Sequence, residues 1–460
     1  MKKILALILA LALCFSLVAC GGEKADAGKT DAGKTDAGKT ETNKTEGKPA
    51  TNPADPDLEP IKIGILIPLS GGSATSGVTM KYVADMIVDE INNELGGIQN
   101  FGGRPIELVY GDTQSDATVS AAEFERLMEE GCVAYIGGYN SPISQSLAPQ
   151  VIANDQIMIM VNAYANGAYL TPNDNVWHVS GVAANGEQTN VEFKNWQREK
   201  LGVKGEVYGY IYTASDYGRD AYDQLVATAE ANGVKEIVGV PVESGVSDLS
   251  SVLMKLKERD DIEYLSCAIP MADAILFIRQ CQQYDVTVPI FAGGSGFAWA
   301  DILDQIGSSS DYLYTTGTHF FDAYRTSYDP ELAYEYGMKC KEAIGWVPDE
   351  NYACMWGDLW TLWDALERAE GLEVSDIKKA LRETNITGEH KALLMTVHDS
   401  ITLPESYTGP ITGTVVYNQN PDYTSLWAMS KDGEYRLVYP EDMANPNYPV
   451  TYPVPSWSER

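Results

Sequence analysis

The stretch IKIGILIPL at residues 61–69 predicts a buried strand, because it is a short run of apolar, largely β-branched side chains. Small residues follow at 70–77 (SGGSATSG) and predict a loop. Apolar side chains then recur at three- and four-residue spacing up to Gly96-Gly97, which predicts an amphipathic helix; they are Met80, Ala84, Ile87, Ile91 and Leu95. A strand, a loop and a helix in this order begin a βαβ unit.

The same alternation continues along the chain. Further strands are predicted at 106–110, 133–136 and 157–161, with helices at 119–130 and 145–153. The rhythm restarts after residue 182 with helices at 186–200, 219–232, 249–257 and 272–284 and strands at 206–212, 236–240, 264–268 and 289–291. We therefore expect an α/β fold with two doubly wound parallel-sheet lobes, in which a ligand binds outside the carboxyl ends of the strands.

The first twenty residues indicate export. Lys2 and Lys3 precede an apolar run at 4–18, which is too short to span a membrane stably and has the length of a secretory signal. The sequence Leu17-Val18-Ala19-Cys20 followed by two glycines resembles the lipobox of bacterial lipoproteins. That resemblance implies a signal peptide at 1–19 and a diacylglycerol on Cys20, which anchors the protein to the membrane outside the cytoplasm. An ordinary cleaved signal peptide is the alternative, and it also implies export.

Residues 20–60 form a predicted tether. The motif DAGKT occurs at 26–30, 31–35 and 36–40, and bulky apolar side chains are almost absent from residue 21 to about residue 60. Such a segment cannot bury enough surface to offset chain entropy, so we expect it to be disordered. Residues 28–35 (GKTDAGKT) match the phosphate-loop pattern, but no strand precedes them and no helix follows, so we reject nucleotide binding there.

Composition excludes several classes of function. The formal net charge of −32 disfavours DNA and RNA as partners. The four histidines have no metal-ligand spacing, so no metal site and no cofactor are expected. Five cysteines lie in the body, where a Cys340–Cys354 bridge and buried free thiols both remain open; they are Cys132, Cys267, Cys281, Cys340 and Cys354.

Several motifs in the body occur in an order typical of one family. They are IGILIPLSG at 63–71, EIN at 90–92 with GGI at 96–98, GRPIEL at 103–108, DTQSD at 112–116, IGG at 136–138 before Ser141, YGR at 217–219, GPITG at 409–413 and KDG at 431–433. Together they resemble the type I periplasmic binding proteins, in particular the leucine/isoleucine/valine-binding family that serves ABC importers.

The resemblance implies an organisation for the whole body. Three crossovers near Gly181, Gly317 and Leu403 would form a hinge between lobe 1 (61–181 plus 318–403) and lobe 2 (182–317 plus 404–460). It also implies a small-molecule ligand and an ABC permease in the membrane as partners. We expect a monomer and no enzymatic activity.

The family's ligand pocket can be transferred to this chain residue by residue. Ser141 and the run Asn162-Ala163-Tyr164 match the groups that hold the ligand carboxylate, although Ser141 is also a plausible helix N-cap. Tyr217 matches an aromatic that closes over the ligand, with loop packing as the alternative, and Ser76 stands where the family often has an aromatic.

The main departure from the family pattern is Ser295. Amino-acid binders carry an acidic residue there, which pairs with the ammonium of the ligand. Because a buried ammonium without a carboxylate is costly, either another acid substitutes or the ligand has no α-ammonium. The candidate substitutes near predicted cleft loops are Asp216, Asp273 and Asp322.

An aromatic stripe occurs near residue 352. Tyr352, Trp356, Trp360 and Trp363 are three or four residues apart, which predicts a packed helix face, with only Tyr352 a candidate ligand contact.

The sequence therefore predicts a lipid-anchored solute receptor that captures a small polar solute, such as an amino acid or a related carboxylate or amide, by hinge closure. A sensor of the same fold that signals through a membrane partner is the alternative. A surface hydrolase is disfavoured, because neither a G-x-S-x-G motif nor a Cys/His nucleophile motif occurs.

Overall fold

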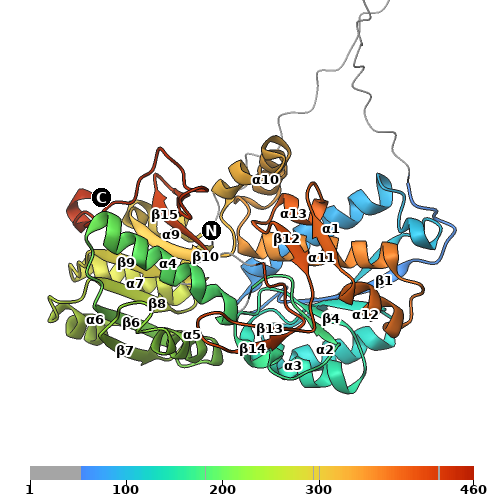
Figure 1. Cartoon of the computed structure of the whole chain (residues 1–460), viewed down its shortest axis with the longest axis horizontal. Helices are drawn as coiled ribbons and strands as arrows, with labels where there is room; N and C mark the ends of the chain where they lie inside the picture. Colours follow the sequence, from blue (N-terminus) through green and yellow to red (C-terminus); the bar gives the residue numbers. More distant parts are fainter. Residues whose placement is uncertain (1–52, 182, 294, 300, 423–424) are drawn as a thin grey trace, which may run out of the picture. The chain divides into compact units, whose positions relative to one another are not determined.

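In the computed structural model, the strand predicted at residues 61–69 is present as β1, Ile61–Ile67 (Figure 1). The structure describes residues 53–460 except 182, 294, 300 and 423–424, and it describes the backbone but not the side chains of 183, 185–190, 290–293, 295 and 301. The predicted signal peptide, Cys20 and most of the tether therefore lie outside the described residues.

The first sheet is parallel throughout, in the order β2-β1-β3-β4-β5. Its strands are β1 (Ile61–Ile67), β2 (Ile106–Asp112), β3 (Ala134–Gly137), β4 (Met158–Met160) and β5 (Val176–Trp177). The helices between them are α1 (Ala74–Asn93), α2 (Ala117–Glu129) and α3 (Ser141–Ala153), with short 3-10 turns at Gln99–Phe101 and Asn166–Tyr169.

Strand β1 is buried on both faces. Ile61, Ile63, Ile65 and Ile67 face one core, which α1 and α11 (Glu350–Arg368) also line, whereas Leu66 faces a second core with residues of α2 and α3. The alternation places helices on both sides of the sheet, as expected for a parallel sheet.

Helices from the later part of the chain cover the first sheet too. α11 packs against α1, and its Trp356 and Trp360 are completely buried in the first core, so the aromatic stripe is a packing face as predicted. The other elements of this part are α10 (Pro330–Ile344), α12 (Val374–Arg382), α13 (Lys391–Leu394) and the pair β11 (Asn385–Thr387) and β12 (Ser400–Thr402).

The second sheet has the order β16-β15-β10-β9-β8-β6-β7. Its parallel strands are β6 (Val207–Thr213), β7 (Glu236–Val242), β8 (Tyr264–Ala268), β9 (Ile290–Gly293) and β10 (Leu313–Gly317). β15 (Leu426–Lys431) and β16 (Glu434–Tyr439) add an antiparallel edge that the sequence analysis did not predict.

Helices again flank this sheet. They are α4 (Ala183–Leu201), α5 (Asp216–Ala227), α6 (Ser250–Lys257), α7 (Met271–Gln283), α8 (Ser295–Ala298) and α9 (Asp301–Ile306), with 3-10 turns at Gly307–Ser310, Phe321–Thr326 and Trp457–Glu459. The two-sheet α/β fold class is therefore the one predicted, with mixed strand direction at one edge of the second sheet.

The hairpin β13 (Ser406–Thr408) and β14 (Val415–Tyr417) lies before the chain enters β15. Val416 is completely buried in the second core of the first sheet, the core that also contains Leu66. The boundaries of the lobes stay a prediction, and this hairpin is a segment of the predicted lobe 2 that contacts residues of the first sheet.

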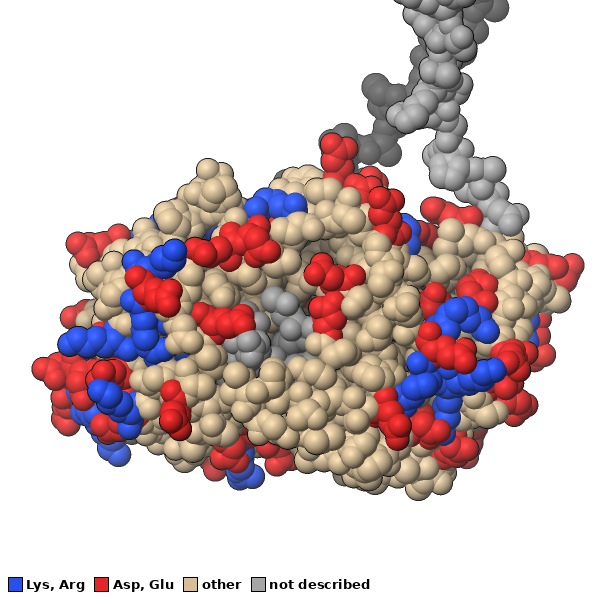
Figure 2. All heavy atoms as spheres, in the orientation of Figure 1, with Lys and Arg blue, Asp and Glu red and all other residues tan. Residues whose placement is uncertain are grey.

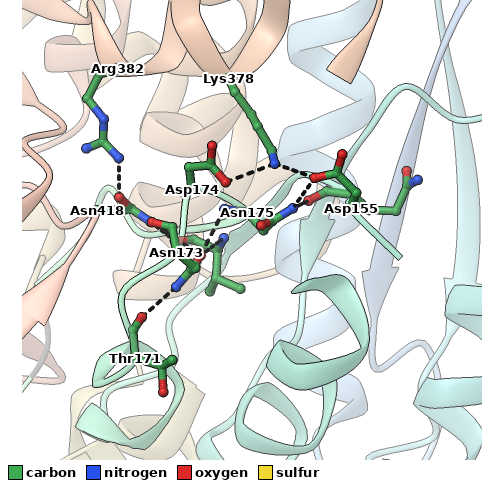
Figure 3. Close-up of polar contacts among 10 residues, drawn as sticks. Asp155, Thr171, Asn173, Asp174, Asn175, Lys378, Arg382 and Asn418 are labelled. Carbon is green, nitrogen blue, oxygen red and sulfur yellow. Dashed lines mark hydrogen bonds and ion pairs between the residues drawn. The ribbon is translucent and has the colours of Figure 1, made fainter. Parts of the chain in front are cut away.

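A polar network holds the segment after β14 in place (Figure 3). The Asn418 side-chain amide donates to the carbonyls of Asn173 (2.8 Å) and Val176 (2.9 Å) and accepts a hydrogen bond from Arg382. Beside it, the Lys378 ammonium reaches Asp155 at 2.6 Å and Asp174 at 3.0 Å. α12 is thereby tied to both the loop before β5 and the segment that leads to β15.

All five cysteines of the body are buried free thiols, so the Cys340–Cys354 bridge that the sequence left open is not formed. Among residues 53–460, wherever the structure describes them, no helix has the length and apolar character needed to cross a membrane.

Candidate functional site

A cavity of about 390 Å³ lies where strands of both sheets end. Its wall includes residues that follow β3, β4, β6, β8 and β10, together with side chains from α4, α5 and α11. The carboxyl ends of parallel strands are the usual ligand positions in such sheets. The cavity is therefore where the fold predicts a ligand.

Aromatic side chains form much of the wall. Tyr208 and Tyr264 stack with ring centroids 4.7 Å apart, and other rings contribute from both sheets. The aromatic residues of the wall are Tyr139, Tyr164, Tyr208, Tyr210, Tyr217, Tyr264, Trp299 and Trp427. Such a surface favours an organic solute with an apolar or planar part.

The start of α3 supplies polar groups. Asn140 is the N-cap, and its side chain accepts a hydrogen bond from the Ile143 N–H at 3.2 Å. The next residue, Ser141, lines the cavity, and its hydroxyl oxygen accepts the Ala165 backbone N–H at 3.1 Å. Because that bond uses a lone pair, the Ser141 hydroxyl keeps its proton as a donor. The N-cap is thus Asn140, one residue earlier than the alternative that the sequence left open.

The segment after β4 forms the adjacent wall. Asn162 and Tyr164 line the cavity, whereas Ala163 is completely buried and outside the lining. Asn162 has a φ of 45°, a left-handed conformation that asparagine tolerates well. Its amide donates to the Asn351 side-chain oxygen at 2.9 Å, so this segment contacts the start of α11.

Of the remaining predicted ligand contacts, one lines the cavity and two are buried away from it. Tyr217 lines the cavity from α5. Ser76 is buried behind Tyr139, whose hydroxyl donates to it at 3.0 Å. Tyr352 lies in the first core, stacked on Trp356, and is outside the lining. The Ser295 side chain falls outside the described part of the chain. The roles of these residues in binding stay predictions.

None of the three proposed substitute acids lines the cavity. Asp216 is exposed at the start of α5. Asp273 accepts the Gly245 backbone N–H at 3.1 Å. Asp322 pairs with Arg325 at 3.0 Å and accepts the Leu437 N–H at 2.9 Å. The last two carboxylates already serve structural contacts.

Sequence reasoning missed two charged residues of the wall. Glu350, the first residue of α11, is 5% exposed, and Lys194 of α4 is 7% exposed with its ammonium 5.1 Å from the Tyr208 ring centroid. Asp349 is the N-cap of α11, because its carboxylate accepts the N–H groups of Asn351 and Tyr352. That aspartate was the available signal, since it fixes where α11 begins and hence where Glu350 lies.

Burial raises the pKa of Glu350, an effect that the neighbouring Asn162 amide, the Thr318 backbone N–H and the Trp299 side chain partly offset. The contacts of its two oxygens are long, 3.4 Å to the Asn162 amide nitrogen and 3.4 Å to the Thr318 backbone nitrogen. Within the described residues, no cluster of three or more His, Cys, Asp or Glu side chains suits a metal ion.

The strands of two α/β sheets end at one aromatic cavity, and this arrangement is typical of two-sheet solute-binding proteins. The sequence model of the periplasmic binding protein family matches residues 60–399. The chain therefore belongs to the periplasmic binding protein family, whose name implies a location outside the cytoplasm.

Individual relatives agree with this assignment. A Leu/Ile/Val-binding protein homolog from Brucella suis is 23% identical over 384 residues, covering 82% of this chain and 93% of that protein. Among solved structures, a leucine-binding protein from Thermotoga maritima aligns with a TM-score of 0.67 at 20% identity, covering 83% of this chain and 99% of that one.

A solute-binding protein from Rhodopseudomonas palustris in complex with 3,4-dihydroxybenzoic acid has a TM-score of 0.64 at 16% identity, covering 82% of this chain and 94% of that one. The chain belongs to a family of binding proteins, which confirms the expectation that it is not an enzyme.

Proposed function

We propose that this protein is the solute-binding component of an ABC importer, exported and anchored through Cys20, and that it captures a small carboxylate-bearing solute in the cavity between its two sheets. The observation that carries the proposal is the cavity itself. It collects a hydroxyl donor at the start of α3 and aromatic rings from both sheets at the ligand position of this fold.

Two features support a carboxylate on the solute. The Ser141 hydroxyl has a proton to donate, and it lies at the start of a helix of 13 residues, where the helix dipole favours negative charge. The name of the Thermotoga relative and the complex of the Rhodopseudomonas relative both indicate carboxylates as ligands within this fold.

The surface charge suits a small solute better than a nucleic acid. Figure 2 shows Asp and Glu in several clusters across the visible face, many of them beside Lys or Arg, with uncharged surface between the clusters. With a formal net charge of −32, the protein repels polyanions, whereas a small zwitterion or monoanion needs only the local donors of the cavity.

The support for membrane anchoring is the sequence at residues 17–20 and the predicted tether. The support for hinge closure is that residues from both sheets line the cavity. A solute that bridges the two sheets favours the closed state, because only that state completes its contacts.

A thermal-shift screen of the standard L-amino acids, their amides and aromatic carboxylates tests the proposal. We expect at least one of these solutes to raise the melting temperature, with a gain of about 2.7 kcal/mol at a hundredfold excess over Kd. Small-angle scattering with that solute should show a smaller radius of gyration. A tight solute that leaves the scattering unchanged contradicts hinge closure, and failure of every small solute contradicts the proposed function.

A further inference from the structure

Glu350 is the one carboxylate among the described residues that line the cavity. Its position is fixed by the start of α11, where Asp349 caps the helix with contacts of 3.0 and 3.2 Å to backbone nitrogens. The carboxylate therefore belongs to a rigid helix end and not to a loop.

The partners of Glu350 are weak for a buried acid. Its two oxygens have contacts of 3.4 Å to the Asn162 amide and to the Thr318 N–H, both beyond the usual length of a hydrogen bond to a carboxylate. Among the described residues, no lysine, arginine or histidine forms an ion pair with it. A buried carboxylate that lacks a positive partner is costly, so the site is incomplete as it stands.

We propose that Glu350 holds a cationic nitrogen of the solute. It would thereby replace the acidic residue that amino-acid binders of this family carry at the position of Ser295. The inference rests on the proposed function, because it names the second charged group of the same solute. The aromatic wall, including Trp299, strengthens it, since aromatic faces attract cations as well as apolar groups.

The segment from Asn162 to Ala165 links the two groups. Asn162 contacts Glu350 at one end of this segment, and the Ala165 N–H contacts Ser141 at the other. Ser141 and Glu350 also both line the same cavity of about 390 Å³. We therefore expect a zwitterionic solute in this cavity to meet the carboxylate-binding group and the nitrogen-binding group together.

The test compares solutes that differ only in the amino group. Wild type, Glu350→Gln and the control Asp216→Asn are titrated calorimetrically with L-leucine and 4-methylpentanoate, and with L-phenylalanine and 3-phenylpropanoate. Asp216 is an exposed acid outside the lining, so its variant removes one negative charge without touching the cavity. Glu350→Asp is the second variant, which retains the charge if Glu350→Gln fails to fold.

We expect wild type and Asp216→Asn to prefer an amino acid over its partner without the amino group by about 30-fold or more, and Glu350→Gln to abolish that preference. Glu350→Asp should retain part of it. The inference is overturned if wild type binds both members of a pair equally, or if Glu350→Gln weakens both equally, which would indicate a structural role.

Failure of this inference is distinguishable from failure of the proposed function. Tight binding of carboxylates that lack an amino group, with no preference for amino acids, overturns the role of Glu350 and leaves the proposed function intact. Binding of no carboxylate or amino acid at all overturns both.

Discussion

Replacement of Ser141 by alanine should reduce both stability and solute affinity, for two separate reasons. The Ser141 hydroxyl oxygen accepts the N–H of Ala165, a residue with no exposed surface. Without that oxygen a buried donor has no partner, which costs about 1–3 kcal/mol of the free energy of unfolding. The bound carboxylate also loses a donor, and a similar free energy corresponds to a loss of roughly 5- to 150-fold in affinity.

Ser144 provides the matched control. It is also completely buried and on α3, but its hydroxyl donates to the Ser141 backbone carbonyl at 3.0 Å and it does not line the cavity. Ser144→Ala should therefore cost about 0.5–1.5 kcal/mol of stability and leave affinity within about twofold.

Urea unfolding measures stability, and calorimetric titration with the tightest solute of the screen measures affinity. An unchanged affinity in Ser141→Ala refutes the assignment of the carboxylate to this hydroxyl. An equal loss of affinity in both variants shows instead that α3 packing, and not the hydroxyl, controls binding.

Three further predictions concern the anchor, the segment after β14 and the response to pH. Cys20→Ala should move the protein from the membrane to the soluble fraction with an unchanged melting temperature, and a variant that still sediments with membranes contradicts the lipid anchor. Asn418→Ala removes the amide hydrogen bonds to Asn173 and Val176 and the one accepted from Arg382, at a left-handed φ of 56°, so urea unfolding should show a loss of about 2–4 kcal/mol. A loss below about 0.5 kcal/mol would show that the network in Figure 3 contributes little to stability. Burial lowers the pKa of His178 and of His319 to about 3. The unfolded chain therefore binds more protons than the folded protein between roughly pH 6.5 and 3. As the pH falls through that window, each histidine reduces the free energy of unfolding by up to about 1.4 kcal/mol per pH unit. In His319→Met, the free energy of unfolding should change less with pH between pH 7 and 5 than in wild type. The comparison of the two proteins cancels the opposite effect of buried carboxyls such as Glu350. Identical slopes in both proteins would contradict a neutral buried His319.

Much of the fold follows from local pattern. The run at 61–69 predicts β1, and the spacing of Met80, Ala84 and Ile87 predicts α1, because a buried strand and a half-buried helix each have a characteristic apolar period. The antiparallel edge formed by β15 and β16 was missed, since a pairing of residues 313–317 with 426–431 is fixed by tertiary contact and not by any local signal.

The site was predictable only in part. Ser141, Asn162, Tyr164 and Tyr217 line the cavity, because they follow strand ends that the topology brings to one place, and their roles in binding stay predictions. Glu350 was missed, since 188 residues separate it from Asn162 and neither periodicity nor motif spacing encodes that approach. Ser76 was proposed from the resemblance and Tyr352 from its place at the start of the aromatic stripe. Both side chains are buried outside the cavity lining, which tertiary packing decides and local sequence does not.

The most direct test of the central claim is a crystal structure of the protein with the solute that stabilises it most. We expect the solute to occupy the cavity between the two sheets, with its carboxylate at the Ser141 hydroxyl and its less polar part against the aromatic wall. A solute found outside this cavity, or one within it whose carboxylate points away from Ser141, would overturn the proposed binding site.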